Sequence, residues 1–207
     1  MSKRKFERTS TNTLKFATSF FGSLENLDLL EIAFSNKQII TLRQYTNYVS
    51  LVAFTVELGM KTIILNEEDI YAIHDIEELY NKMPTVFHVM FEKYYTNEAI
   101  YNFLQRVKNI YPEFRYMETA NIPFFTDKII DMSNGNIDFT KIADNKYFIF
   151  LRTLLDEVVK LHKAIYKLVD ISKLENREDE TASMEAMEIV HEELNKIQTS
   201  LYVAEKE

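Results

Sequence analysis

The sequence contains no cysteine, which excludes disulfides, thiol nucleophiles and thiolate zinc sites. It has no tryptophan, only three prolines, and only three glycines, at positions 22, 59 and 135. A dinucleotide-binding fingerprint and a Walker loop both need closely spaced glycines, so neither can exist in this chain. A β-sandwich or a Rossmann-type sheet needs many turns, so the scarcity of glycine and proline favours a fold built from helices.

The sequence also lacks a membrane-spanning or secretory segment. A spanning helix needs about 18 or more apolar residues with few or no charges, and the best run, Tyr45 to Ile64, contains Glu57 and Lys61. The basic residues 1–5 are followed by polar residues rather than by the apolar region of a signal peptide. We therefore expect a cytoplasmic protein that does not contact a membrane.

Negative charge is in excess, and it is concentrated at one end. The net charge is −8, and residues 175–207 hold ten acidic and three basic side chains, a net charge of −7. This balance argues against general affinity for nucleic acid. The other residues are close to neutral, which leaves room for a local phosphate site.

Apolar residues recur every three or four positions in most of the chain, as in amphipathic helices. We expect one all-α domain over 14–207, preceded by a flexible basic arm over 1–13. Residues 112–145 have little periodicity and are expected to form a loop, although Asn134-Gly135 would also suit the turn of a short strand pair. The expected helices cover 23–34, about 41–64, 74–83, 97–111 and, as an antiparallel hairpin, 147–204.

The hairpin is predicted from two apolar seams whose spacing alternates between four and three residues, as in coiled coils. The seam residues are Leu151, Leu155, Val158, His162, Ile165 and Val169 in the first helix, and Met187, Val190, Leu194, Ile197 and Leu201 in the second. Tyr147, Phe148 and Phe150 extend the apolar surface beyond the seam. That surplus favours a homodimer or a complex with another protein through the same surface. Packing of these aromatic side chains under 112–145 is the alternative.

No catalytic or metal site is recognisable. The four histidines form no H-x-x-x-H motif, and Glu188-Ile-Val-His191 is the only Glu-x-x-His motif, whereas a di-iron site in a helical bundle needs two. His162 lies within an apolar seam, where a histidine is usually a packing residue. We assign no catalytic residue, no metal and no cofactor.

Aromatic and basic residues lie close together in one part of the sequence. Tyr94, Tyr95, Tyr101 and the aromatic residues of 111–116 are near four basic residues, Lys93, Arg106, Lys108 and Arg115. Stacking beside a local positive patch is how single-stranded RNA is held, although core aromatic residues with a solvated polar face are the favoured interpretation.

Three segments resemble motifs of the HEPN superfamily of helical bundles. Residues 57–63, Glu-Leu-Gly-Met-Lys-Thr-Ile, are similar to the family pattern E-x-x-L-K-x-L, with Met60 and Ile63 in place of leucines. Residues 74–79, His-Asp-Ile-Glu-Glu-Leu, are similar to H-D-L-x-x-L. Residues 114–118, Phe-Arg-Tyr-Met-Glu, resemble the Arg-Tyr element that ends a later helix.

The resemblance implies a HEPN-like bundle with a polar cluster at one end. Its expected members, which also form a candidate binding site, are Glu57, Lys61, His74, Arg115 and Glu118. HEPN ribonucleases carry an Arg followed a few residues later by a His. The nearest case here, Arg152 and His162, has nine residues between the two, and helical geometry does not align their side chains.

The expected function is therefore a non-catalytic binding or regulatory module of a bacterial defence, toxin–antitoxin or mobile-element system. It would act on a protein partner, with RNA or a nucleotide as a further ligand. Two alternatives stay open. One is a phage or mobile-element inhibitor that blocks host defence by protein contact, and the other is an atypical HEPN ribonuclease.

Overall fold

The computed structural model describes residues 5–37, 39–111, 130–131, 136–138 and 145–166. These residues are mostly helical, which confirms the all-α prediction. The helices are α1 (Ser10–Lys37), α2 (Leu42–Leu65), α3 (Ile76–Lys82), α4 (Thr85–Glu92), α5 (Asn97–Val107) and α7 (Lys146–Tyr166). The strands are β1 (Lys5–Phe6), β2 (Ile39–Thr41), β3 (Ile70–Tyr71), β4 (Ile130–Asp131) and β5 (Asn136–Asp138).

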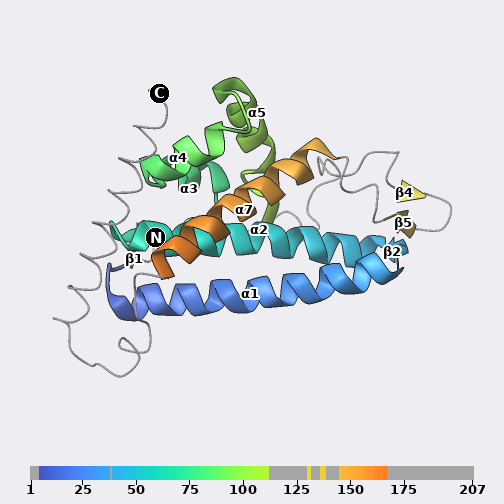
Figure 1. The fold of residues 1–207 in the computed structure, drawn as a ribbon, viewed down its shortest axis with the longest axis horizontal. Coiled ribbons are helices and arrows are strands. Elements are labelled where there is room, and N and C mark those ends of the chain that lie inside the picture. The colour runs from blue at the N-terminus through green and yellow to red at the C-terminus, as the bar shows by residue number, and fades with distance from the viewer. Residues whose placement is uncertain (1–4, 38, 112–129, 132–135, 139–144, 167–207) are drawn as a thin grey trace.

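Helices α1 and α2 form a long antiparallel hairpin, side by side over most of their length (Figure 1). A capping box starts α2: the Thr41 hydroxyl accepts a hydrogen bond from the Gln44 amide at 3.3 Å, and the Gln44 side chain accepts one from the Thr41 amide at 2.9 Å. The sequence predicted only a short helix over 23–34. The observed α1 begins at Ser10, so the apolar stripe that includes Phe20 also packs on α2.

The N-terminal arm is shorter than the sequence indicated. Strand β1 pairs antiparallel with β3, and Lys5 forms an ion pair with Asp69 at 2.5 Å. The Arg8 amide donates to the same carboxylate at 2.6 Å. From Lys5 onward the expected arm is therefore part of the fold, while residues 1–4 lie outside the described part of the chain. The polar sequence of residues 1–13 gave no sign that residues 5–6 would pair with a strand at residues 70–71.

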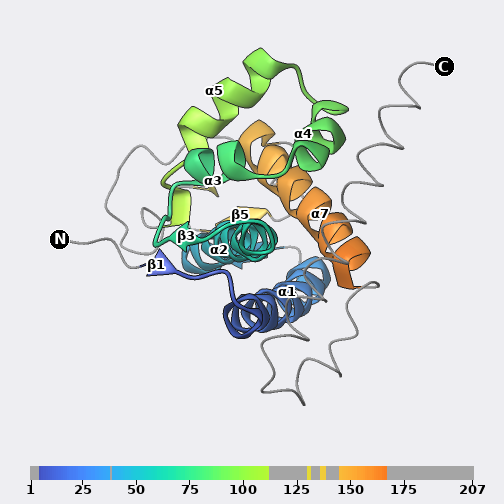
Figure 2. The same ribbon diagram turned by 90° about the vertical axis from the view of Figure 1, so that its left-hand side faces the viewer.

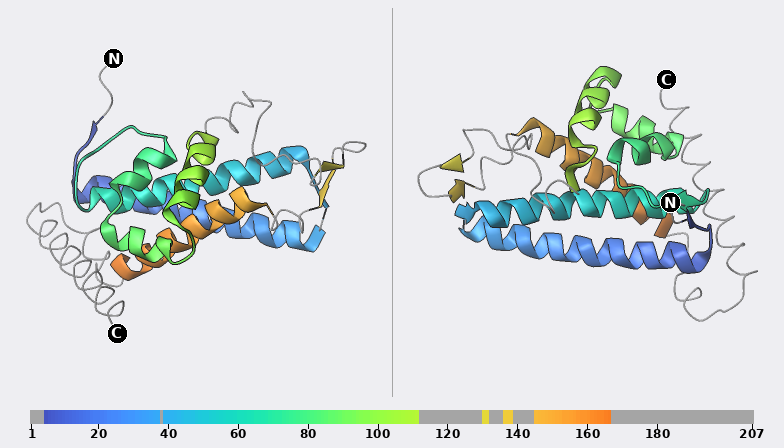
Figure 3. Two further views of the ribbon diagram at one scale, coloured as in Figure 1. Left: turned by 90° about the horizontal axis from the view of Figure 1, so that it is seen from above. Right: turned by 180° about the vertical axis from the view of Figure 1, so that it is seen from behind.

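A small antiparallel sheet, in the order β2-β5-β4, covers the turn between α1 and α2 (Figure 3). Ile40 and Ile137 are paired across it, and both are buried. The loop expected over 112–145 thus contains strands β4 and β5, the less favoured alternative. The rest of 112–144 lies outside the described residues.

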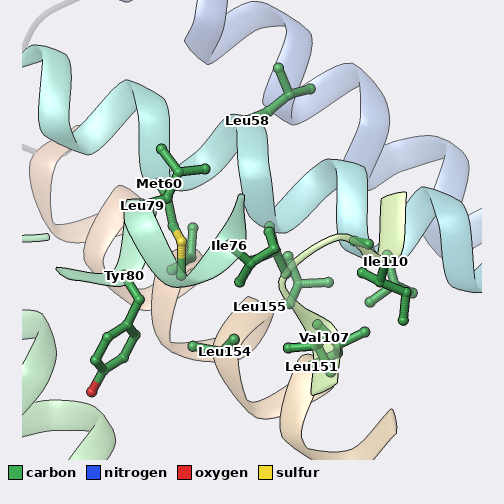
Figure 4. Packing of buried hydrophobic residues seen from close by; sticks show 14 of the residues in the cluster. Leu58, Met60, Ile76, Leu79, Tyr80, Val107, Ile110, Leu151, Leu154 and Leu155 are labelled. Atoms are coloured by element: carbon green, nitrogen blue, oxygen red, sulfur yellow. The ribbon is translucent and has the colours of Figure 1, made fainter. Parts of the chain in front are cut away.

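Helix α2 is the centre of the fold. Seen along its axis, it has α1 on one side and α3 and α7 on others (Figure 2). It is the one helix of the described chain that is long and apolar enough to cross a membrane, but 83% of that apolar stretch is buried, as in the core helix of a soluble protein. Side chains of α2, α3 and α7 gather in one cluster, which includes Met60, Leu79 and Leu155 (Figure 4).

The first helix of the predicted hairpin exists as α7, and its seam packs on α2. Val158 lies against Gly59, and the His162 ring bonds to the Gly59 carbonyl at 3.2 Å. Phe148 and Phe150 are buried, so they supply no free surface for association. The second helix of the predicted hairpin falls in 167–207, outside the described residues.

Candidate functional site

The C-terminal half of α2 and the segment before α3 position three of the five predicted cluster residues. Glu57 and Lys61 are one helical turn apart, so both side chains lie on the same face of α2. His74 precedes Asp75, whose carboxylate caps α3 by accepting hydrogen bonds from two amides of its first turn. This cap fixes the backbone beside His74, whose ring reaches Glu57 of α2.

The three side chains meet at one carboxylate oxygen. Lys61 Nζ lies 2.5 Å from Glu57 Oε1, and His74 Nδ1 lies 3.0 Å from the same atom. The side chains of Glu57 and Lys61 are 2% and 5% exposed, whereas that of His74 is 58% exposed. The cluster thus consists of a buried ion pair, Glu57 and Lys61, and of a third residue, His74, that faces solvent.

The second carboxylate oxygen of Glu57 could accept a further hydrogen bond. Oε2 is buried and has no hydrogen-bond partner among the described residues. Burying a carboxylate oxygen without a donor is costly, so this position suits a further donor such as a guanidinium. Arg115 and Glu118, the other two predicted members, lie outside the described part of the chain.

A metal ion does not fit the residues seen here. One carboxylate and one imidazole provide too few ligands, and Lys61 already occupies the carboxylate. Nowhere in the described ranges do three His, Asp or Glu side chains gather as they would around a metal.

Arg152 belongs to a separate network that joins three helices. Its guanidinium lies 2.8 Å from Glu31 of α1, and the Tyr48 hydroxyl of α2 donates to the same carboxylate at 2.5 Å. Burial and the Glu31 carboxylate raise the pKa of Tyr48, so the phenol keeps its proton and its donor role. Sequence reasoning missed this network because its members are far apart in the chain and follow no motif.

His162 is a packing residue, as its place in the seam predicted. Its ring stacks on Phe20 with centroids 4.3 Å apart, and Phe21 meets its edge. Burial lowers the pKa of His162 to about 4, against the opposing effect of its bond to the Gly59 carbonyl. A neutral ring without solvent access cannot exchange protons with a bound substrate.

The aromatic residues near basic charge divide into two groups. Tyr95 packs against Phe91 and Phe150 in the core. Tyr94 and Tyr101 are exposed, and Lys160 Nζ lies over the Tyr94 ring, 5.7 Å from its centre. Arg106 lines a hollow together with Lys146, a residue that the sequence analysis did not single out because it begins a different helix.

Comparison of the chain with models of protein families, with curated proteins and with solved structures found no match. A functional proposal therefore rests on the geometry of the described residues and on the resemblance of the α2 and α3 segments to HEPN motifs.

Proposed function

We propose that this protein is a non-catalytic, HEPN-like binding module with a regulatory role in a bacterial defence, toxin–antitoxin or mobile-element system. The observation that carries the proposal is the buried ion pair of Glu57 and Lys61, with the exposed His74 bound to the same Glu57 oxygen. The three residues belong to the two segments that resemble HEPN motifs, and they come together although the chain turns back between them.

The cluster supports a structural role better than a catalytic one. Glu57 and Lys61 neutralise each other and have almost no contact with solvent. His74 is the one exposed member, and its ring bonds to the Glu57 carboxylate, which Lys61 already neutralises. Acid–base catalysis of RNA cleavage needs more than one such group.

The Arg and His that come nearest to the ribonuclease motif also fail to form a site. Arg152 is held by Glu31, and His162 is sealed between α1, α2 and α7. This arrangement favours binding over the ribonuclease alternative. The anti-defence alternative rested on acidic residues in 175–207, which lie outside the described residues.

Helix α1 offers the surface for a protein partner. Leu29 and Ile32 are 66% and 61% exposed, and they lie one turn apart on the same face. Exposed neighbouring apolar side chains are typical of contact surfaces. The expected homodimer or protein complex, which was based on Phe148 and Phe150, is therefore reassigned to this face of α1.

The test compares tagged wild-type protein with the Leu29→Asp/Ile32→Asp variant. Both are expressed in, and purified from, the organism in which the protein naturally occurs. We expect a stoichiometric protein partner with the wild type and its loss with the variant. Tyr101→Asp is the control because it places an aspartate at a similarly exposed position of another helix, α5. Light scattering identifies the case in which the partner is a second copy, since the single chain has a mass of 24.5 kDa. Equal recovery of partners by wild type and double variant would contradict the assignment to α1.

A further inference from the structure

A surface hollow of about 550 Å³ is lined by residues of α5 and of the beginning of α7. Such a volume falls within the range of about 300–1,000 Å³ that is usual for small-molecule sites. Its lining consists of Asn102, Phe103, Gln105 and Arg106 from α5, and of Lys146 and Tyr147 from α7. This hollow is formed by other residues than the Glu57 cluster and the exposed face of α1.

Two cations of the lining are available to a ligand. Arg106 and Lys146 are exposed, and in the described ranges neither forms an ion pair. The nearby carboxylate of Glu77 is already engaged, because Gln105 donates to it at 2.5 Å and Lys108 lies 3.8 Å away. The charged side chains among the described lining residues are therefore both positive, although the whole chain carries −8.

The apolar part of the lining is continuous with the core. The Phe103 and Tyr147 rings meet edge to face with centroids 5.8 Å apart. The Phe103 ring also packs on the fully buried Phe150, with ring centroids 4.7 Å apart, and this contact holds the Phe103 ring in place. Lys146 Nζ lies 5.0 Å from the centre of the Tyr147 ring, so positive charge and aromatic surface are adjacent.

The direction of α7 strengthens the positive field. The hollow is at the N-terminal end of this 21-residue helix, where the helix dipole favours an anion. The Asn145 side chain accepts hydrogen bonds from the amides of Tyr147 and Phe148. The helix therefore contributes its field, while Arg106 and Lys146 supply the donors.

We propose that this hollow binds a nucleotide. Arg106 and Lys146 hold the phosphate through charge-assisted hydrogen bonds, and the base lies against Phe103 and Tyr147. Asn102 supplies an amide that can both donate to and accept from a base or a ribose. A simple anion would leave the aromatic side chains unused. The same chemistry is presented by a free nucleotide and by a nucleotide within single-stranded RNA.

The experiment titrates the full-length protein with two probes at about 50 mM salt. Calorimetry measures binding of the four nucleoside 5′-monophosphates, and fluorescence anisotropy measures binding of a labelled ten-nucleotide single-stranded RNA. We expect saturable binding of at least one probe, weakened by raising the salt to about 200 mM. The Arg106→Gln/Lys146→Gln variant should bind about tenfold or more weakly, since two charge-assisted contacts are removed.

The matched control is Arg43→Gln/Lys163→Gln, which removes the same two kinds of charge from exposed positions of α2 and α7 away from the hollow. It should bind like the wild type, and circular dichroism should show both variants folded. Binding of mononucleotides that depends on Arg106 and Lys146 identifies a free-nucleotide site, and binding of the RNA alone with the same dependence identifies a strand site. Either result supports the proposal. Absence of binding at millimolar probe, or equal weakening in both double variants, would overturn it. The result is independent of partner binding by α1.

Discussion

At the scale of single residues, Glu57 shows why the polar cluster holds its shape. Its carboxylate is buried, and both Lys61 and His74 bind the same oxygen. Taking two charges out of water is costly, and their attraction offsets this cost only while both partners are present. The cluster therefore specifies how the segment before α3 docks on α2, more than it adds to stability.

Replacing Lys61 by Met should destabilise the protein by about 3–5 kcal/mol, because it leaves the Glu57 charge buried with His74 alone. Replacing both residues, in Glu57→Leu/Lys61→Met, should recover much of that loss. Urea unfolding followed by circular dichroism measures both effects. Lys82→Met, which breaks an exposed pair with Glu68, is the control and should change stability by less than about 1 kcal/mol. A similarly small effect of Lys61→Met would show that the pair is not buried as described.

His162 makes stability depend on pH. Its folded-state pKa is lowered to about 4 from 6.5, so the unfolded chain takes up a proton at a pH at which the folded chain does not. The free energy of unfolding should therefore fall as the pH drops from about 6.5 to about 4, by roughly 3 kcal/mol from this residue. In His162→Leu this contribution should disappear, so the two stability curves converge or cross at low pH. Parallel curves between pH 7 and pH 4 would be evidence that His162 is accessible to protons in the folded protein.

At the scale of elements, the contact between α2 and α7 depends on Gly59. A Cβ atom at this position would overlap Val158 and lie 2.8 Å from the Phe20 ring, so the three helices approach closely only without a side chain there. Gly22, in the middle of α1, has nothing within 4 Å of the same position. The two glycines therefore provide a matched pair.

Gly59→Ala should lower the free energy of unfolding by about 1–3 kcal/mol, because overpacking exceeds the gain in helix propensity. Gly22→Ala should raise it by roughly 0.5–1 kcal/mol, since alanine favours the helix and meets no obstacle. Thermal and urea unfolding of both variants check the two signs. Stabilisation by Gly59→Ala would contradict the close packing of α2 against α7.

The apolar periodicity predicted α2, α5 and α7 well because each has a continuous apolar face. It underestimated α1, whose first turns are polar except for a few residues such as Phe16. It also indicated that the seam of α7 would face a C-terminal helix. In the structure Val158 and His162 face Gly59 of α2, because periodicity identifies a buried face without identifying what covers it.

At the scale of the whole molecule, the candidate site was predictable only where the sequence carried motifs. The resemblance to HEPN motifs predicted that Glu57, Lys61 and His74 lie close together, and in the structure they do. For the hollow between α5 and α7 the sequence indicated Arg106, near aromatic residues, but not Lys146, because only tertiary packing brings the start of α7 beside α5. The membership of Arg115 and Glu118 in the cluster stays a prediction.

We propose that the molecule acts by binding a partner and does not cut RNA. The most direct measurement is incubation of the purified wild-type protein with labelled single-stranded RNA, beside the His74→Gln and His162→Leu variants. All three should leave the RNA intact to the same extent as buffer alone, because Lys61 neutralises the Glu57 carboxylate beside His74 and the His162 ring is buried. Cleavage by the wild type that is lost in His74→Gln or in His162→Leu would contradict the account.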